Sequence, residues 1–232
     1  MNNLKENLET IRTRIESACR RAERNPSDVR ILAVSKRHSV DRIRALHALG
    51  QAAFGENYVQ EAVAKVKQLQ DLHIEWHYIG PLQSNKTREA AAHFAWVQSA
   101  DREKILKRLS GQRPQQLSPL NICIQVNIDR EPQKAGVLPE DTETLARLCT
   151  KLPGLKLRGL MCIPRIGSDE HDPADSYRRT KELFDQLRHS GLEIDTLSMG
   201  MSADLEAAVL HGSTMVRVGT DLLGPRPEPG PA

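Results

Sequence analysis

The chain has 232 residues, of which 39% are hydrophobic and 27% charged, and its formal net charge at pH 7 is only +3. This length and composition can bury a sizeable core, and the mixing of acidic with basic residues argues against a basic surface aimed at nucleic acid. No stretch has the roughly 18 uncharged residues of a membrane span, and the N-terminus lacks the apolar run of a signal peptide. We therefore expect a cytoplasmic globular protein that binds neither nucleic acid nor membranes.

The chain is predicted to open with an amphipathic helix. Leu4, Leu8, Ile11 and Ile15 recur at helical spacing in an otherwise charged stretch, and Asn25-Pro26 breaks the pattern. Short apolar runs and helix-like segments then alternate. Strands are predicted at 30–35, 52–54, 75–79, 95–98, 120–126, 155–161, 194–197 and 215–218, and helices at 39–49, 57–70, 84–93, 101–110, 139–151, 173–190 and 202–211.

This alternation of strands and helices implies that the strands pair in parallel. A doubly wound open sheet and a closed barrel both satisfy the pattern, but eight repeats in about 200 residues match the minimum length of a barrel better. We therefore predict an α/β fold, a single (β/α)8 TIM barrel over residues 1–224 with an extra N-terminal helix. The proline-rich residues 225–232 are predicted to be a flexible tail.

Four cysteines are spread along the chain, and they form no C-x-x-C motif. They are Cys19, Cys123, Cys149 and Cys162. Cysteine is among the residue types most often buried, so we predict reduced core thiols with neither a disulfide nor a metal site.

Two turn segments predict a phosphate site. Function in such a barrel gathers at the C-terminal ends of the strands, and phosphate often binds at the loops after the last two. Residues 198–202 (SMGMS) follow the seventh predicted strand, and Gly219-Thr220 follows the eighth. Gly200 allows a close approach of the backbone, and Ser202 is predicted to cap the next helix. Either segment alone is also ordinary turn chemistry, but together they indicate a phosphate corner.

An apolar strand ends in a lysine in the sequence ILAVSK. Side-chain alternation puts Leu32, Val34 and Lys36 on one face, with Lys36 at the mouth of the barrel and Arg37 and His38 on its rim. Burial and cationic neighbours lower the pKa of a lysine amine, and an uncharged amine can form a Schiff base with an aldehyde. The alternative is a solvated rim lysine.

The same alternation in MVRV (215–218) sends Val216 and Val218 to one face and Arg217 into the barrel. A buried arginine needs acceptors, which either an internal ion pair or a ligand supplies. With Lys36 and the phosphate corner, the site indicates pyridoxal 5′-phosphate (PLP) or a sugar phosphate.

Six blocks in order along nearly the whole chain resemble the pyridoxal phosphate homeostasis protein family. They are 31–36, 54–61, 76–86, 157–164, 198–204 and 216–220. The resemblance implies a barrel similar to the N-terminal domain of alanine racemase, with PLP as its cofactor. It also implies roles for individual residues: Lys36 forms the aldimine, Arg217 faces the pyridine nitrogen, Ser202, Gly219 and Thr220 hold the phosphate, and Asn57, His77, Met199 and Gly200 lie near the cofactor.

The expected function is that of a carrier. An arginine only donates, so the pyridine nitrogen stays unprotonated and the ring is a poor electron sink. Related racemases take a second base, a tyrosine, from an additional domain, whereas this chain ends with the barrel, and Tyr78 is predicted to point away from its interior. We therefore expect no catalytic residue.

The protein would then buffer PLP and deliver it to apo-enzymes, as a monomer or, alternatively, a dimer. A PLP-dependent racemase or related fold-type III enzyme is the alternative function, and a Schiff-base aldolase is a more distant one.

Overall fold

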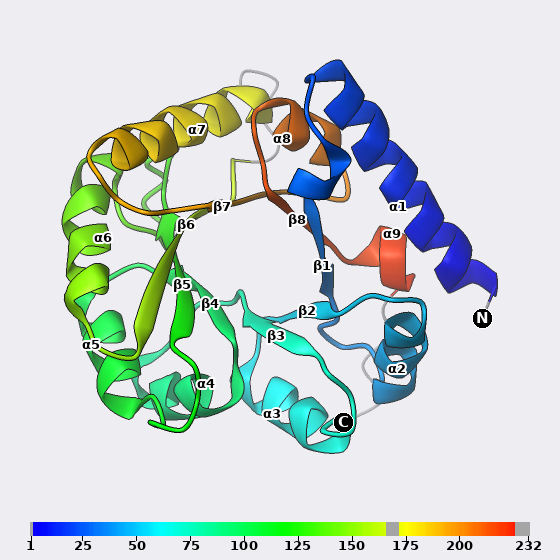
Figure 1. Cartoon of the computed structure of the whole chain (residues 1–232), viewed down its shortest axis with the longest axis horizontal. Helices are drawn as coiled ribbons and strands as arrows, with labels where there is room; N and C mark the ends of the chain where they lie inside the picture. The colour runs from blue at the N-terminus through cyan, green and yellow to red at the C-terminus, as the bar shows by residue number, and fades with distance from the viewer. Residues whose placement is uncertain (1, 166–171, 226–232) are drawn as a thin grey trace.

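The structure, a computed structural model, describes residues 2–165 and 172–225. Within them, parallel strands close into a barrel in chain order, so that the last strand pairs with the first (Figure 1). The strands are β1 (Arg30–Val34), β2 (Ala53–Glu56), β3 (Glu75–Tyr78), β4 (Trp96–Ala100), β5 (Leu120–Val126), β6 (Leu155–Cys162), β7 (Thr196–Met201) and β8 (Met215–Val218). The predicted eight-stranded barrel is therefore confirmed.

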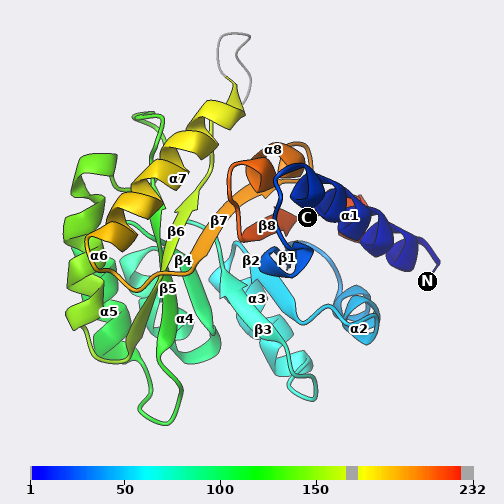
Figure 2. The same ribbon diagram turned by 45° about the horizontal axis from the view of Figure 1, so that its top comes forward.

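Helices surround the strands and alternate with them along the chain (Figure 2). The α-helices are α1 (Asn2–Arg21), α2 (Val40–Ala48), α3 (Val59–Gln68), α4 (Thr87–His93), α5 (Glu103–Gln112), α6 (Thr142–Lys151), α7 (Pro173–His189), α8 (Leu205–Leu210) and α9 (Thr220–Leu223). Short 3-10 turns are η1 (Pro26–Asp28), η2 (Ser84–Lys86) and η3 (Pro139–Asp141). Each predicted helix is present, and α9 is an addition that the sequence pattern did not indicate.

Helix α8 begins three residues later than predicted, because residues 202–204 form a turn. The side chain of Asp204 accepts a hydrogen bond from the Met201 N–H at 2.6 Å, and Asp204 is the residue that precedes the helix. The prediction that Ser202 caps this helix is therefore wrong.

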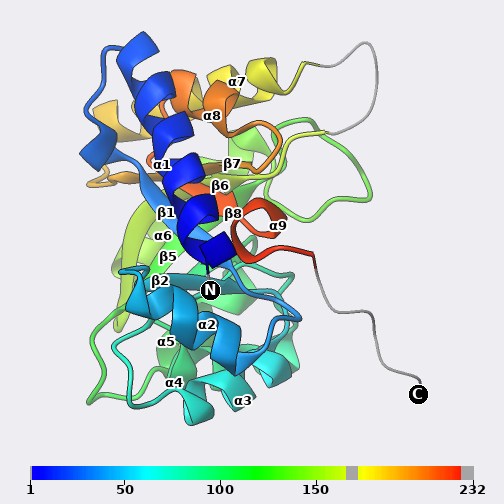
Figure 3. The same cartoon turned by 90° about the vertical axis from the view of Figure 1, so that its right-hand side faces the viewer.

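The N-terminal helix α1 lies along the outside of the barrel against α8 and α9 (Figure 3). Its predicted apolar stripe is buried, from Leu4 through Leu8 and Ile11 to Ile15. Burial of this stripe holds the polar face of α1 next to the loops that follow β7 and β8.

Side chains alternate between the barrel interior and the layer beneath the helices, as predicted. The interior cluster contains Leu32, Ala53, Ile79 and Met215, with Val34 packed against it. The layer between strands and helices instead contains Ala33, Phe54, Val216 and Val218. Arg217 therefore lies on the interior side of β8.

All four cysteines are buried, as predicted. Burial raises the pKa of Cys149 to about 12 and that of Cys162 to about 11, so both thiols stay protonated at neutral pH. No helix in the described part of the chain is both long and apolar enough to cross a membrane. Apart from Pro225, the predicted flexible tail lies outside the described residues.

Candidate functional site

The closed parallel barrel gathers most of the predicted site residues at one end, because all its strands point the same way. Asn57 directly follows β2 and Gly219 directly follows β8, while Lys36 comes two residues after β1. A Cβ placed on Gly219 would lie 3.7 Å from the Cβ of Val34, so the loop after β8 packs against the end of β1. We call this end of the barrel the mouth.

Lys36 occupies the corner of a tight turn. The N–H of His38 donates to the carbonyl of Ser35 at 3.0 Å, and Arg37 between them has φ +64°, in the left-handed region that favours glycine. The N–H of Arg37 donates to Glu61 of α3 at 2.5 Å, which holds the strained residue in place. Lys36 is half-buried, and His38, predicted on the rim, is instead buried because the turn folds it back against the protein.

A buried lysine braces this turn from below. The Nζ of Lys65 donates at 2.7 Å to each of three acceptors: the Ser35 carbonyl, Glu56 and Glu61. The hydroxyl of Ser35 also donates to Glu56 at 2.6 Å. Burial raises the pKa of Glu56, and the charge of Lys65 opposes that rise. The sequence pattern does not distinguish Lys65 as buried, because a lysine in a charged helix resembles a surface residue.

Arg217 is buried in the interior, and none of the described carboxylates is hydrogen-bonded to it. Its Nη1 donates to the carbonyl and the hydroxyl of Ser198 at 2.8 and 3.0 Å, and its Nη2 donates to the carbonyl of Cys162 at 2.8 Å. Burial lowers the pKa of Arg217, but a guanidinium still stays charged. These three bonds leave two of its five N–H groups for another acceptor.

Asn57 also has unused hydrogen-bonding capacity at the mouth. Its Oδ1 is buried and makes no hydrogen bond within the described part of the chain. Alternation along β2 turns it to the interior side, because Ala53 is interior and Glu56 is not. A buried orphan acceptor is costly, so this atom is suited to a ligand that donates a hydrogen bond.

The predicted phosphate corner consists of two loops joined by one arginine. The hydroxyls of Ser202 and Thr220 hydrogen-bond to none of the described residues. Arg14 of α1 donates to the Ser202 carbonyl at 2.7 Å and pairs with Asp221 at 3.1 Å. It also forms a two-pronged pair with Glu206, at 2.6 and 2.8 Å. Arg14 was not predicted as a site residue, because nothing in the helical pattern of α1 distinguishes it from its charged neighbours.

Met199 and Gly200 contribute to packing on the outer side of β7. The side chain of Met199 is fully buried in the core between strands and helices, because alternation turns Ser198 rather than Met199 inward. Gly200 has φ +92°, and a Cβ there would come within 2.4 Å of the Cβ of Ala208. The glycine therefore allows α8 to approach, and the side chain of Met199 does not reach the mouth.

His77 lies deeper in the barrel than predicted. Its ring stacks on Trp96 with centroids 5.0 Å apart, and its two nitrogens lie 2.8 Å from Glu75 and from Gln98. Ile79, two residues further along the chain on the same face, lies closer to the mouth. Both ring nitrogens are engaged, so His77 does not join the residues at the mouth.

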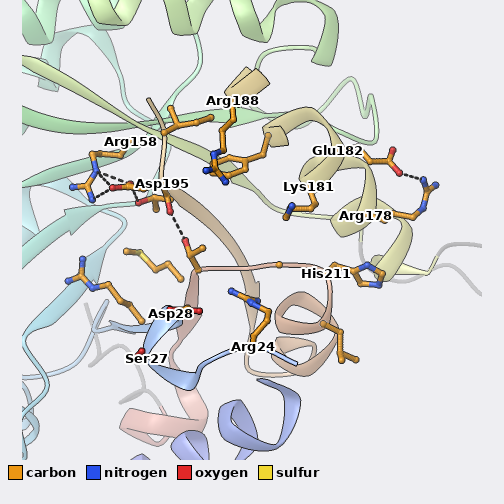
Figure 4. A pocket seen from close by; sticks show the side chains of 18 residues that line it. Arg24, Ser27, Asp28, Arg158, Arg178, Lys181, Glu182, Arg188, Asp195 and His211 are labelled. Atoms are coloured by element: carbon orange, nitrogen blue, oxygen red, sulfur yellow. Dashed lines mark hydrogen bonds and ion pairs between the residues drawn. The ribbon is translucent and has the colours of Figure 1, made fainter. Parts of the chain in front are cut away.

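A cavity of about 810 Å³ opens at the opposite end of the barrel, between α7, α8 and η1 (Figure 4). Its lining contains more basic than acidic side chains. The basic ones are Arg24, Arg30, Arg158, Arg178, Lys181 and Arg188, and the acidic ones are Asp28, Glu182 and Asp195. Helices α7 and α8 end there, and helix C-termini carry partial negative charge. Arg24 donates to the carbonyls of Val209 and Ser213 at 2.7 and 2.8 Å. Arg24 therefore stabilises the C-terminal end of α8, and Arg30, Arg158 and Arg178 are paired with carboxylates.

The chain matches the sequence model of the alanine racemase N-terminal domain over residues 3–227. A pyridoxal phosphate homeostasis protein of Pseudomonas aeruginosa is 49% identical over 232 residues, 100% of both chains. One from Escherichia coli K12 is 45% identical over 229 residues, 97% of this chain and 98% of that protein. The chain belongs to the pyridoxal phosphate homeostasis protein family. The resemblance of the six sequence blocks is thereby confirmed.

Solved structures support membership of the pyridoxal phosphate homeostasis protein family. PipY of Synechococcus elongatus, solved with PLP bound, has a TM-score of 0.82 and 36% identity, and the match covers 95% of this chain and 100% of PipY. Alanine racemase of Corynebacterium glutamicum has a TM-score of 0.68 at 17% identity, covering 95% of this chain and 60% of the racemase. The likeness to the racemase extends to the fold alone.

Proposed function

We propose that this chain binds PLP at the mouth of its barrel, holds it through a covalent bond to Lys36, and buffers it or delivers it to other proteins. The observation that carries the proposal is Arg217, a buried guanidinium that keeps two N–H groups for a ligand and, within residues 2–165 and 172–225, hydrogen-bonds to no carboxylate. The name of the P. aeruginosa relative and the PLP in PipY support it. PLP has an aldehyde for Lys36, a ring nitrogen that can accept a hydrogen bond from Arg217, and a phosphate for the loops after β7 and β8.

Lys36 would hold PLP by a reversible condensation. The uncharged Nζ would attack the aldehyde carbon and form a carbon–nitrogen double bond, and the aldehyde oxygen would leave as water with the two protons of the amine. Addition of water reverses the step and releases PLP. The hydrogen bonds of this turn fix the backbone from which the Lys36 side chain extends, which lowers part of the entropic cost of forming the bond.

The remaining contacts would set affinity and reactivity. Ser202, Gly219 and Thr220 offer hydroxyls and backbone N–H groups to the phosphate, and the Oδ1 of Asn57 accepts from the ring hydroxyl of PLP. Arg217 donates to the ring nitrogen, and because a guanidinium has no proton acceptor that nitrogen stays unprotonated. An unprotonated ring withdraws electrons weakly, which favours storage over catalysis.

A racemase would also need a second base opposite Lys36. Tyr78 packs against Phe94 beneath the helices and donates its hydroxyl to the Pro81 carbonyl at 2.9 Å, and burial raises its pKa to about 12. Tyr177 is fully buried, and burial raises its pKa further still. Tyr58, which is 52% exposed beside Asn57, is the tyrosine left for such a role.

The colour of the protein tests the cofactor and the lysine together. Protein reconstituted with PLP should show a visible absorption band that Lys36→Ala removes and that Lys67→Ala, an exposed lysine on α3, retains. Colourless wild-type protein would overturn the proposal. If the band persists in Lys36→Ala, a residue other than Lys36 forms the covalent bond with PLP.

Two assays separate a carrier from an enzyme. Holo-protein incubated with L-amino acids in deuterated water should show no Cα exchange at enzyme-like rates. Exchange that is lost in Tyr58→Phe would instead establish the racemase. For delivery, holo-protein should activate an apo-PLP enzyme even when a trap captures free aldehyde, whereas complete inhibition by the trap would leave buffering through solvent as the function.

A further inference from the structure

A chain of hydrogen bonds crosses the barrel interior from Arg217 toward the opposite end. Arg217 Nη1 donates to the hydroxyl oxygen of Ser198 at 3.0 Å, and Ser198 donates to Gln98 Oε1 at 2.7 Å. Gln98 Nε2 lies 2.8 Å from His77 Nδ1, and His77 Nε2 lies 2.8 Å from Glu75 Oε1. We call these five residues, which come from β8, β7, β4 and β3, the interior chain.

Glu75 sets the direction of every donor in the interior chain. Burial raises the pKa of Glu75, but the hydrogen bond from His77 and the guanidinium of Arg30, 2.6 Å away, outweigh this and lower it to about 2. A carboxylate only accepts, so His77 Nε2 carries the proton and Nδ1 accepts from Gln98. The Oε1 of Gln98 then faces Ser198 and accepts a hydrogen bond from its hydroxyl. The oxygen of Ser198 is thereby left as an acceptor for the guanidinium.

The middle of the interior chain is closed to solvent. Ser198, Gln98 and His77 are each 0% exposed, so no bulk water can replace a lost partner. Burial also lowers the pKa of His77, which keeps the ring neutral and suited to donate at one nitrogen and accept at the other. If the Ser198 hydroxyl, the Gln98 amide or the His77 ring were turned around, a buried polar atom would be left unpaired, at a cost of about 1–3 kcal/mol.

We infer that Gln98 is a positioning residue for Arg217: by fixing the proton of Ser198, it holds the guanidinium in the direction of the ring nitrogen of the ligand. The inference rests on the proposed function, in which Arg217 faces that nitrogen. Without Gln98, the Ser198 proton is free to rotate toward Arg217, which removes one acceptor. In the described part of the chain, two backbone carbonyls then remain as acceptors for the guanidinium, those of Ser198 and Cys162.

A pair of ligands isolates this effect. The deaza analogue of PLP, in which a C–H group replaces the ring nitrogen, cannot accept from Arg217. Wild-type protein should bind PLP about tenfold more tightly than the analogue, the size expected for one hydrogen bond to a charged group. Gln98→Met keeps the side-chain volume but removes the amide, and it should reduce this preference to within about threefold.

Gln51→Met is the matched control. Gln51 is also a buried amide, donating to the carbonyls of Ile31 and Ala53 at 2.8 and 2.7 Å, but it lies at the start of β2, away from the mouth. This variant should lose stability and keep the wild-type preference for PLP.

The outcomes separate the inference from the proposed function. If Gln98→Met keeps the tenfold preference while binding both ligands more weakly, Gln98 is only structural and the inference fails. If wild-type protein shows no preference, the proposed contact between Arg217 and the ring nitrogen fails. Should Gln98→Met not fold, Ser198→Ala must show the same loss of preference and Ser198→Thr, which keeps the hydroxyl, must restore it; otherwise the inference is overturned.

Discussion

The ammonium of Lys65 and the carboxylate of Glu56 lie 2.7 Å apart beneath the turn that presents Lys36, with side chains only 7% and 0% exposed. Such a pair is sensitive to the removal of one partner, because the other is left as an unpaired buried charge. The position of Lys36 thus depends on a residue 29 positions later in the chain.

Replacing the lysine should therefore be costly. Lys65→Met is expected to lower the free energy of unfolding by about 3–5 kcal/mol, measured by denaturant titration at pH 7. Adding Glu56→Gln removes the stranded charge and should recover more than half of the loss. A single variant within about 1 kcal/mol of wild type would show that the pair contributes little.

The stability of the protein in acid should depend on Glu75. Its pKa is about 2 in the folded state against an ordinary 4.5, so the unfolded chain binds more protons between these values. Its contribution is therefore complete above pH 4.5 and is lost as the pH falls toward 2. Glu75→Gln should be less stable than wild type at pH 6, and this deficit should shrink steadily in acid. Glu16→Gln, an exposed change on α1, should leave the acid profile unchanged, and a constant deficit for Glu75→Gln would contradict the assignment.

The phosphate loops should distinguish PLP from pyridoxal. Replacing Ser202 and Thr220 together by alanine removes two hydroxyls and should weaken PLP binding by at least about tenfold, with a smaller effect on pyridoxal. Equilibrium dialysis with both ligands measures the ratio, and Ser118→Ala, in an exposed loop, serves as the control. Equal losses for the two ligands would remove these hydroxyls from the phosphate site.

Arg14 should affect the same ratio without touching the ligand. Arg14→Ala frees the Ser202 carbonyl and Asp221 together, so PLP affinity should fall by roughly threefold to tenfold while pyridoxal affinity changes less. Arg12→Ala, an exposed arginine on the same helix, should change neither. Unchanged PLP affinity in Arg14→Ala would mean that the two loops hold their positions alone.

Much of the mouth follows from alternation along short strands. The alternation of side chains along β8 correctly predicts that Arg217 points into the barrel and that Val216 and Val218 pack beneath the helices. Alternation gives the face of a strand but not the depth. His77, which the family resemblance places near the cofactor, lies deeper in the barrel, between Glu75 and Gln98.

The supporting residues could not be predicted because their roles depend on distant partners. Arg14 hydrogen-bonds to Ser202, which lies 188 positions later in the sequence, and Lys65 hydrogen-bonds to Ser35, which lies 30 positions earlier. In the sequence both are ordinary charged residues of amphipathic helices. The shortened start of α8 has a similar origin, since the side chain of Asp204 competes with the helix for the backbone of the preceding turn.

The contact between Arg14 and Asp221 spans 207 positions, so it joins the first helix to the last. A ribosome makes α1 long before α8 and α9, and until then α1 has only its smaller contacts with η1 and α2. Much of the apolar stripe of α1 therefore stays uncovered until synthesis of the chain is nearly complete. The contacts of Arg14 with the loops after β7 and β8 can likewise form only after α9 has been made.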